Sequence, residues 1–241
     1  MLLRIAAVLA LYTSSVHLFA GQRHVVAPME ASSVASFSRS TLFVTWHMAS
    51  CLLVSTAVLL GYFGDHIEPV MRGFLAAQAA FAAGLFLVRG QRVHGGGFAL
   101  PQWILLGTLA LAIAVPELAA ALVLLALAAV HVMWAFGVSW PSPSARKAPS
   151  YVIGFSEGAK LPSVPATLTV AVVLVAMAWA SWHGPRWAAF ATAAVLGARG
   201  VYGPLERFVR PSIVGKPYAI LSAAFYSPLC LFLAALIVAR E

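Results

Sequence analysis

Apolar runs of about twenty residues recur along the whole chain, and they restrict the fold more than any other feature. A helix of about 20 apolar residues crosses the roughly 30 Å hydrocarbon layer of a bilayer. Between the runs stand segments rich in Gly, Pro and charge, such as "GDHIEP" and "WPSPSARKAPS", which end helices. The pattern predicts eight spanning helices, at residues 3–21, 40–62, 69–89, 99–115, 117–139, 164–183, 185–202 and 218–238.

The least marked boundary between these spans is at Pro116. A single helix from 99 to 139 would be about 60 Å long, which is twice the hydrocarbon thickness, so a turn is expected at the proline. Composition leaves no room for a separate soluble domain, since 62% of the residues are hydrophobic and 9% are charged. We predict an all-α, polytopic membrane bundle of about eight helices.

Basic residues are divided unevenly between the two ends of the predicted helices. With eight spans both termini lie on one side, which carries four of the 15 Lys and Arg residues, while the other side carries eleven. Cytoplasmic loops collect Lys and Arg, so we predict both termini outside the cytoplasm. The net charge of +8 has the same origin, and without a basic block interleaved with aromatics, nucleic acid is not an expected partner.

The two halves of the chain share rare residues at a constant spacing. A Val-His pair occurs at 16–17 and again at 130–131, and the same shift of 114 residues aligns Arg72 with Arg186. Internal repeats are frequent in membrane folds. Because each half holds an even number of spans, the second copy has the orientation of the first. The spacing predicts two parallel four-helix repeats, residues 1–115 and 116–241.

From about residue 120 onward the chain carries four motifs in order: "VHVMW" at 130–134, "LPSVPATL" at 161–168, "ARGVYG" at 198–203 and "FYSPLCLFLA" at 225–234. In these motifs it resembles a family of bacterial integral membrane proteins classed as a domain of unknown function. The last motif is the most specific. The third departs from the family's pattern, because "GPLER" stands where an acidic residue is expected soon after the glycine. The resemblance implies a four-helix fold in a bacterial inner membrane and no particular activity.

Three histidines lie inside predicted spans, away from the span ends: His17, His47 and His131. Ionisable side chains inside a bilayer are costly and often functional. Counted from the predicted cytoplasmic ends they lie about 6 to 12 Å deep, which places them in one layer. One hypothesis is a haem held by His17 and His131 across the axis between the repeats, because haem needs axial nitrogen ligands and an apolar pocket. The alternatives are a site for a quinone, lipid or other small hydrophobic ligand, and simple hydrogen bonding between helices.

Metal binding and catalysis have less support. Met48 and Cys51 near His47 are too little for a copper site, and no other metal site is predicted. No glutamate lies deep in a predicted span, and the chain has neither a nucleophile elbow nor an HExxH motif. No catalytic residue is assigned. One enzyme hypothesis remains, in which His47 is a general base acting on a lipid beside the hydroxyl of Tyr12 or Tyr226.

The segment after residue 202 mixes basic and apolar residues at the predicted cytoplasmic face. Arg207, Arg210 and Lys216 lie close to Phe208 and Ile213, a composition that suits binding of anionic lipid headgroups. Arg199, near the end of the preceding span, is expected to reach the surface by snorkelling.

These features favour a non-enzymatic binding or accessory protein of the inner membrane, in which the histidine layer holds a hydrophobic ligand or haem. The expected partners are membrane lipid, a small hydrophobic ligand and further membrane subunits. Two alternatives remain open: a transporter of a neutral substrate with its site between the repeats, and a lipid-modifying intramembrane enzyme.

Overall fold

The computed structural model describes residues 1–93, 102–140, 142 and 144–241. The predicted start of the fourth span, residues 99–101, lies outside these residues. In the described part the chain is mainly helical and contains no strand. The bounds of the long helices are α1 (Leu2–Gly21), α3 (Ser36–Phe63), α4 (Pro69–Val93), α5 (Gln102–Ala114), α6 (Pro116–Ala135), α8 (Val164–Trp182) and α9 (Arg186–Val209).

The last long helix is continuous from Pro217 to Arg240 and contains a π-helical turn. It consists of α10 (Pro217–Leu221), the π turn η4 (Ser222–Tyr226) and α11 (Ser227–Arg240). The shorter helical segments are η1 (Gln22–Val26), α2 (Ala27–Glu30), η2 (Gly64–His66), α7 (Ala148–Val152) and η3 (Pro211–Ile213).

Six of the described helical segments are long and apolar enough to cross a membrane, which indicates a membrane protein. They are Leu2–Glu30, Ser38–His66, Pro69–Phe86, Pro116–Ala135, Val164–Trp182 and Pro217–Arg240. The two other predicted spans correspond to α5, which has 13 residues, and to α9, which carries three arginines and a glutamate. The predicted turn between the fourth and fifth spans is present, because α6 begins at Pro116.

Two predicted helix ends are wrong. The first helix does not end at Gly21 but continues through η1 to Glu30, and the seventh continues from residue 202 to Val209. Pro204 lies inside α9 and does not end it. Proline is tolerated in membrane helices where neighbouring groups satisfy the freed backbone. The last turns of α9 are also held by side-chain contacts of the buried Glu206, described below.

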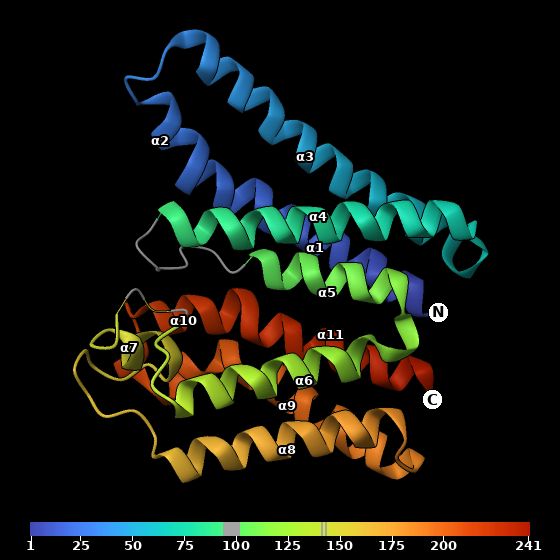
Figure 1. Cartoon of the computed structure of the whole chain (residues 1–241), viewed down its shortest axis with the longest axis vertical. Coiled ribbons are helices and arrows are strands. Elements are labelled where there is room, and N and C mark those ends of the chain that lie inside the picture. The colour runs from blue at the N-terminus through green and yellow to red at the C-terminus, as the bar shows by residue number, and fades with distance from the viewer. Residues whose placement is uncertain (94–101, 141, 143) are drawn as a thin grey trace.

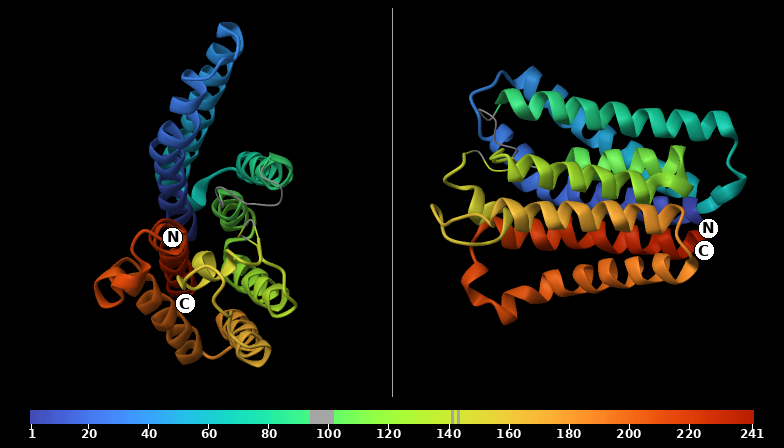
Figure 2. Two further views of the ribbon diagram at one scale, coloured as in Figure 1. Left: turned by 90° about the vertical axis from the view of Figure 1, so that its left-hand side faces the viewer. Right: turned by 60° about the horizontal axis from the view of Figure 1, so that its bottom comes forward.

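The helices pack as pairs of chain neighbours that run along a common direction (Figure 1). α1 packs on α3, α4 on α5, α6 on α8, and α9 on α11. Further contacts join α1 with α5 and α11, and α6 with α11. Both termini lie at one end of the bundle, and α2 and α7 lie at the other (Figure 1). The α1–α3 hairpin contacts the other helices through α1 and projects from the rest of the bundle (Figure 2).

The core lies where α1, α5, α6 and α11 meet. Its fully buried large side chains include Leu9, Leu109, Ile113, Leu124 and Leu233. Alanines such as Ala6, Ala10 and Ala119 are also buried, and small residues allow the helices to approach closely where lipid supplies no hydrophobic driving force. The shorter helix α5 is therefore an interior element, which explains how it joins the bundle despite its length.

Candidate ligand-binding cavity

A cavity of about 850 Å³ lies in the C-terminal part of the bundle. It is partly open and is bordered by α5, α6, α8, α9 and the helix from Pro217 to Arg240, and two alanines of α4 also line it. Its walls are mainly aliphatic: Leu105, Leu127, Val173, Leu174, Met177 and Leu229 are among the lining residues.

The cavity arises from how the helix pairs meet. α6 and α8 form one close pair and α9 and α11 form another, and α5 contacts α6 (Figure 1). Small residues face the space between the pairs, among them Gly107, Ala110 and Ala126. A Cβ built on Gly107 would meet no atom within 4 Å, so the space beside it is open.

His131 lies in the cavity wall, on α6. Its Nδ1 is 2.8 Å from the carbonyl oxygen of Leu127, one turn earlier on the same helix. A carbonyl can only accept, so Nδ1 carries the proton and Nε2 keeps its lone pair in the neutral ring. The ring is edge-on to Trp134, whose indole N–H donates to the carbonyl of Trp140.

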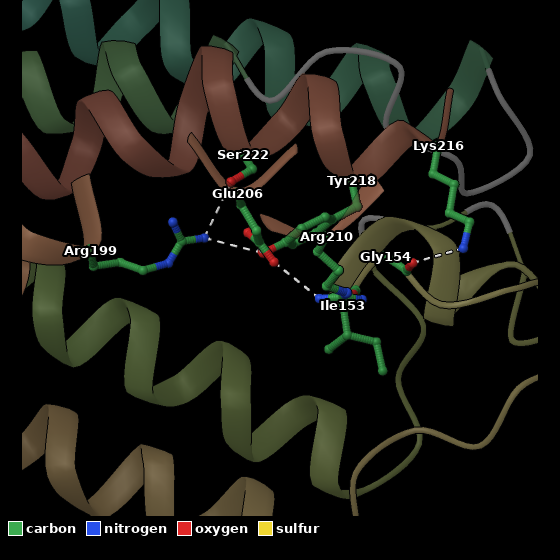
Figure 3. A network of polar contacts seen from close by, with 8 residues as sticks. All are labelled: Ile153, Gly154, Arg199, Glu206, Arg210, Lys216, Tyr218 and Ser222. Carbon is green, nitrogen blue, oxygen red and sulfur yellow. Dashed lines mark hydrogen bonds and ion pairs between the residues drawn. The ribbon is translucent and has the colours of Figure 1, made fainter. Parts of the chain in front are cut away.

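Arg199 lies in the same wall, on α9. Its Nη2 donates to the hydroxyls of Tyr218 and Ser222, each at 3.3 Å (Figure 3). Its Nη1 is buried and has no hydrogen-bond partner. Among the residues that the structure describes, no carboxylate lies within 4.0 Å of the guanidinium. The prediction that Arg199 snorkels to the surface is wrong, since it is directed to neighbouring helices.

Tyr218 connects Arg199 to a buried carboxylate. Its hydroxyl accepts from Arg199 and donates to Oε2 of Glu206 at 2.8 Å. The other carboxylate oxygen, Oε1, accepts from Nη1 of Arg210 at 3.0 Å (Figure 3). Glu206 is 5% exposed. A buried carboxylate is stable only when paired and hydrogen-bonded, and this one has both contacts.

Arg210 and Lys216 hold the segment that follows α7 next to Tyr218 in the cavity wall. Arg210 donates through Nη2 to the carbonyl of Ile153 at 2.7 Å, and Lys216 donates to that of Gly154 at 2.9 Å (Figure 3). Gly154 has φ +70°, and a Cβ there would lie 2.7 Å from the Tyr218 ring. Glycine is therefore required on both counts. Tyr218 and Val152, from the two sides of this contact, both line the cavity.

A further feature of the cavity wall is the π turn η4, which separates α10 from α11. A π turn shifts the helical register by one residue and often occurs at functional sites. Tyr226, at its end, lines the cavity, and its buried hydroxyl has no hydrogen-bond partner. Next to it, Ser227 packs so closely on α9 that a Cβ on Gly203 would lie 1.8 Å from its Oγ.

The other two predicted histidines lie elsewhere. His17 is 6% exposed, its Nδ1 is 3.0 Å from the Ser50 hydroxyl, and its ring stacks on Trp46 with centroids 3.8 Å apart. His47 is half-buried and edge-on to Phe43. Neither is among the residues that line the cavity, and no described contact joins either to His131. The structure thus brings His17 and His47 to the α1–α3 pair and His131 to the cavity.

The three basic residues predicted to bind headgroups differ in their surroundings. Arg207 is exposed, with its guanidinium carbon 4.8 Å from the centroid of the Phe208 ring. Arg210 and Lys216 make the intramolecular contacts described above. Sequence reasoning missed the roles of Glu206, Tyr218 and Ser222. These polar residues flank the motifs "ARGVYG" and "YSPLC". The predicted seventh span ended at residue 202, before Glu206, so this carboxylate was not considered as a group inside a helix.

Residues 124–237 match the model of a family described as "Protein of unknown function (DUF3995)". The matched segment begins within α6 and ends within α11. It therefore contains His131, Arg199, Tyr218 and Tyr226, whereas α5 and α4 add their part of the wall from outside it. No curated protein and no solved structure matches the chain.

Proposed function

We propose that this protein binds a small lipophilic molecule within the membrane, in the cavity between α5, α6, α8, α9 and α11. The observation that carries the proposal is the cavity itself, which has about 850 Å³ and apolar walls with a few polar groups. Binding sites for small molecules have volumes of about 300–1,000 Å³ and this kind of lining. The role is that of a binding or accessory protein, as the sequence favours.

The polar groups of the cavity support binding of a ligand in one orientation. His131, Arg199 and Tyr226 are three of the polar groups in the wall, and they offer a lone pair, a positive charge and a hydroxyl. The aliphatic side chains of α6 and α8 supply the remaining surface. A ligand with an apolar body and one polar end fits this division.

The setting of the cavity is part of the proposal. We place the chain in a bacterial inner membrane with both termini outside the cytoplasm. The support is the excess of Lys and Arg in the loops at the end of the bundle opposite the termini.

We also propose that residues 1–115 and 116–241 are parallel repeats. The support is that helices one and two, three and four, and one and four pack together in each half.

A haem ligated by His131 is a second candidate. The hydrogen bond from Nδ1 to the Leu127 carbonyl leaves the Nε2 lone pair free, and this arrangement is usual for histidines that bind metals. His17 lies in the α1–α3 pair and does not line the cavity, so this version takes only His131 as a ligand from the two histidines. A Soret band in the purified protein that is lost in His131→Ala and kept in His17→Ala would support this version.

The binding proposal is tested by the molecules that co-purify with the protein. Detergent-purified wild type is compared by native mass spectrometry and lipid extraction with Leu174→Trp, which fills the cavity. The control is Val172→Trp on the same helix, because Val172 is 68% exposed and does not line the cavity. We expect a bound lipophile in wild type and the control and its loss in Leu174→Trp. Equal occupancy in all three would overturn the proposal.

A further inference from the structure

The positive charge of Arg199 has no counter-ion in the cavity wall. The wall contains no aspartate or glutamate, and none lies within 4.0 Å of the guanidinium in the described part of the chain. The hydrogen-bond partners of its Nη2 are two neutral hydroxyls, at 3.3 Å each. A charge in an environment of low dielectric constant is costly when unpaired and strongly attracts an opposite charge.

Glu206 does not neutralise Arg199 directly. One of its oxygens is bound to Arg210 at 3.0 Å and the other to the Tyr218 hydroxyl at 2.8 Å. The pair formed by Glu206 and Arg210 is therefore complete, and Arg199 reaches it only through Tyr218 (Figure 3). Of the two cationic side chains in this network, Arg199 is the one that faces the cavity.

We propose that the ligand is an amphiphile with an anionic head next to Arg199 and an apolar chain along α6 and α8. This inference rests on the proposed function and names its substrate class. The anion supplies the missing counter-charge, and its oxygens accept hydrogen bonds from the guanidinium and from the Tyr226 hydroxyl, which has no partner. Carboxylate and phosphate share this chemistry, so a long-chain carboxylate and a lipid phosphate are the two sources.

The chain of the ligand is expected to follow the aliphatic wall. Val173, Leu174 and Met177 of α8 and Val123 and Leu127 of α6 line the cavity, and none of them carries a strong hydrogen-bonding group. A second polar group on the ligand would find no partner among these side chains, and burying it there would be unfavourable. A single head and one unsubstituted chain therefore fit the site.

Competition binding tests the charge requirement. Tritiated hexadecanoate is bound to the purified full-length protein in neutral detergent and displaced by unlabelled hexadecanoate, hexadecyl phosphate or hexadecanol, which have the same chain. We expect hexadecanol to compete on the order of tenfold to a hundredfold less well than the better anion. The ranking of the two anions distinguishes the carboxylate source from the phosphate source.

Arg199 variants connect this preference to the residue. Arg199→Gln is expected to bring the acid and the alcohol within about threefold of each other, whereas Arg199→Lys retains a preference for the anion because it retains the charge. Size-exclusion profiles show whether each variant is folded, and the wild-type comparison of acid with alcohol requires no variant at all.

The outcomes separate this inference from the proposed function. If hexadecanol competes as well as hexadecanoate in wild type, or if Arg199→Gln keeps the full preference for the anion, the anionic head is overturned and cavity binding stands. If no compound binds wild type above the level of Leu174→Trp, the proposed function fails and the inference fails with it.

Discussion

His17 and His131 occupy corresponding places in the chain but very different surroundings. Each lies 15 residues after the first residue of its helix, Leu2 or Pro116, and each helix starts at the end of the bundle that holds the termini. The α1 partner helix, α3, places the Trp46 indole flat on His17. The α6 partner helix, α8, offers Leu174 and Met177 instead, and a cavity remains beside His131.

The difference shows that the neighbours of a buried histidine decide whether it is a packing group or a candidate ligand-binding group. An indole and a hydroxyl satisfy His17 from within the protein. His131 is satisfied at Nδ1 by its own helix, and its remaining nitrogen adjoins open space. The match to the DUF3995 model covers the part of the chain that supplies most of the cavity wall, including His131 and Arg199.

The largest expected effect comes from removing Trp46, whose indole packs on His17. Trp46→Ala deletes an indole in contact with His17, and loss of its packing is expected to cost about 3 kcal/mol. The measurement is the free energy of unfolding in a mixed-micelle SDS titration. Trp134→Ala, which enlarges an existing cavity, is the matched change in the second half and should cost clearly less. Equal losses of stability in the two variants would contradict the difference between His17, which is closely packed, and His131, which adjoins the cavity.

The next largest effect is expected from removing the charged partner of the buried Glu206 carboxylate, which has no counterpart among the described residues of the first half. Arg210→Ala leaves the Glu206 carboxylate buried with Tyr218 as its remaining partner, and we expect a loss of about 2–3 kcal/mol. In the first half, Arg39 is partly exposed and donates to the carbonyl of Glu30, so Arg39→Ala should change stability by about 0.5 kcal/mol or less. The same unfolding titration measures both. A loss as small for Arg210→Ala as for Arg39→Ala would show that the Glu206 network contributes little.

Two glycines test the space available beside each site. A Cβ on Gly21 would lie 1.9 Å from Trp46, so Gly21→Ala should destabilise the protein by about 1–2 kcal/mol through overpacking. Gly107→Ala projects into the cavity and meets nothing within 4 Å, so it should be neutral or stabilise by about 0.5–1 kcal/mol. Thermal unfolding followed by circular dichroism compares them. The idea of an open second site is contradicted if Gly107→Ala is the more harmful change.

The smallest difference in stability between the two halves is expected for the histidines, which should differ in ligand binding instead. Either His17→Ala or His131→Ala should cost about 1–2 kcal/mol for the hydrogen bond and packing lost. Occupancy of the co-purified ligand, measured by native mass spectrometry, should fall in His131→Ala and stay at the wild-type level in His17→Ala. Loss of the ligand in His17→Ala alone would contradict a binding site beside His131.

The helical architecture was predictable because the hydrocarbon thickness sets the length of an apolar run that crosses it. The errors came where local signals compete with packing. "GPLER" reads as a break, yet α9 continues through Pro204 because Glu206 finds Arg210 and Tyr218 beside it. These partners come from later turns and from the next helix, so no pattern within the segment shows that the carboxylate is satisfied.

The candidate site was predictable only in part. His131 stood out because an ionisable group in an apolar run is rare, and the structure places it in the cavity wall. His17 stood out for the same reason and is covered by Trp46, a residue 29 positions away on another helix. Arg199 was assigned to the surface, because its depth was counted from a helix end that lies seven residues too early.

By itself the sequence determined that this chain forms long apolar helices and where most of them begin and end. These properties depend on local composition and on one external length, the thickness of the bilayer. Only the tertiary structure decided which polar side chains face open space, because a cavity exists where side chains from several helices together fail to fill a volume. The volume left unfilled depends on how the helices are placed relative to one another, and the sequence of a single helix carries no information about that placement.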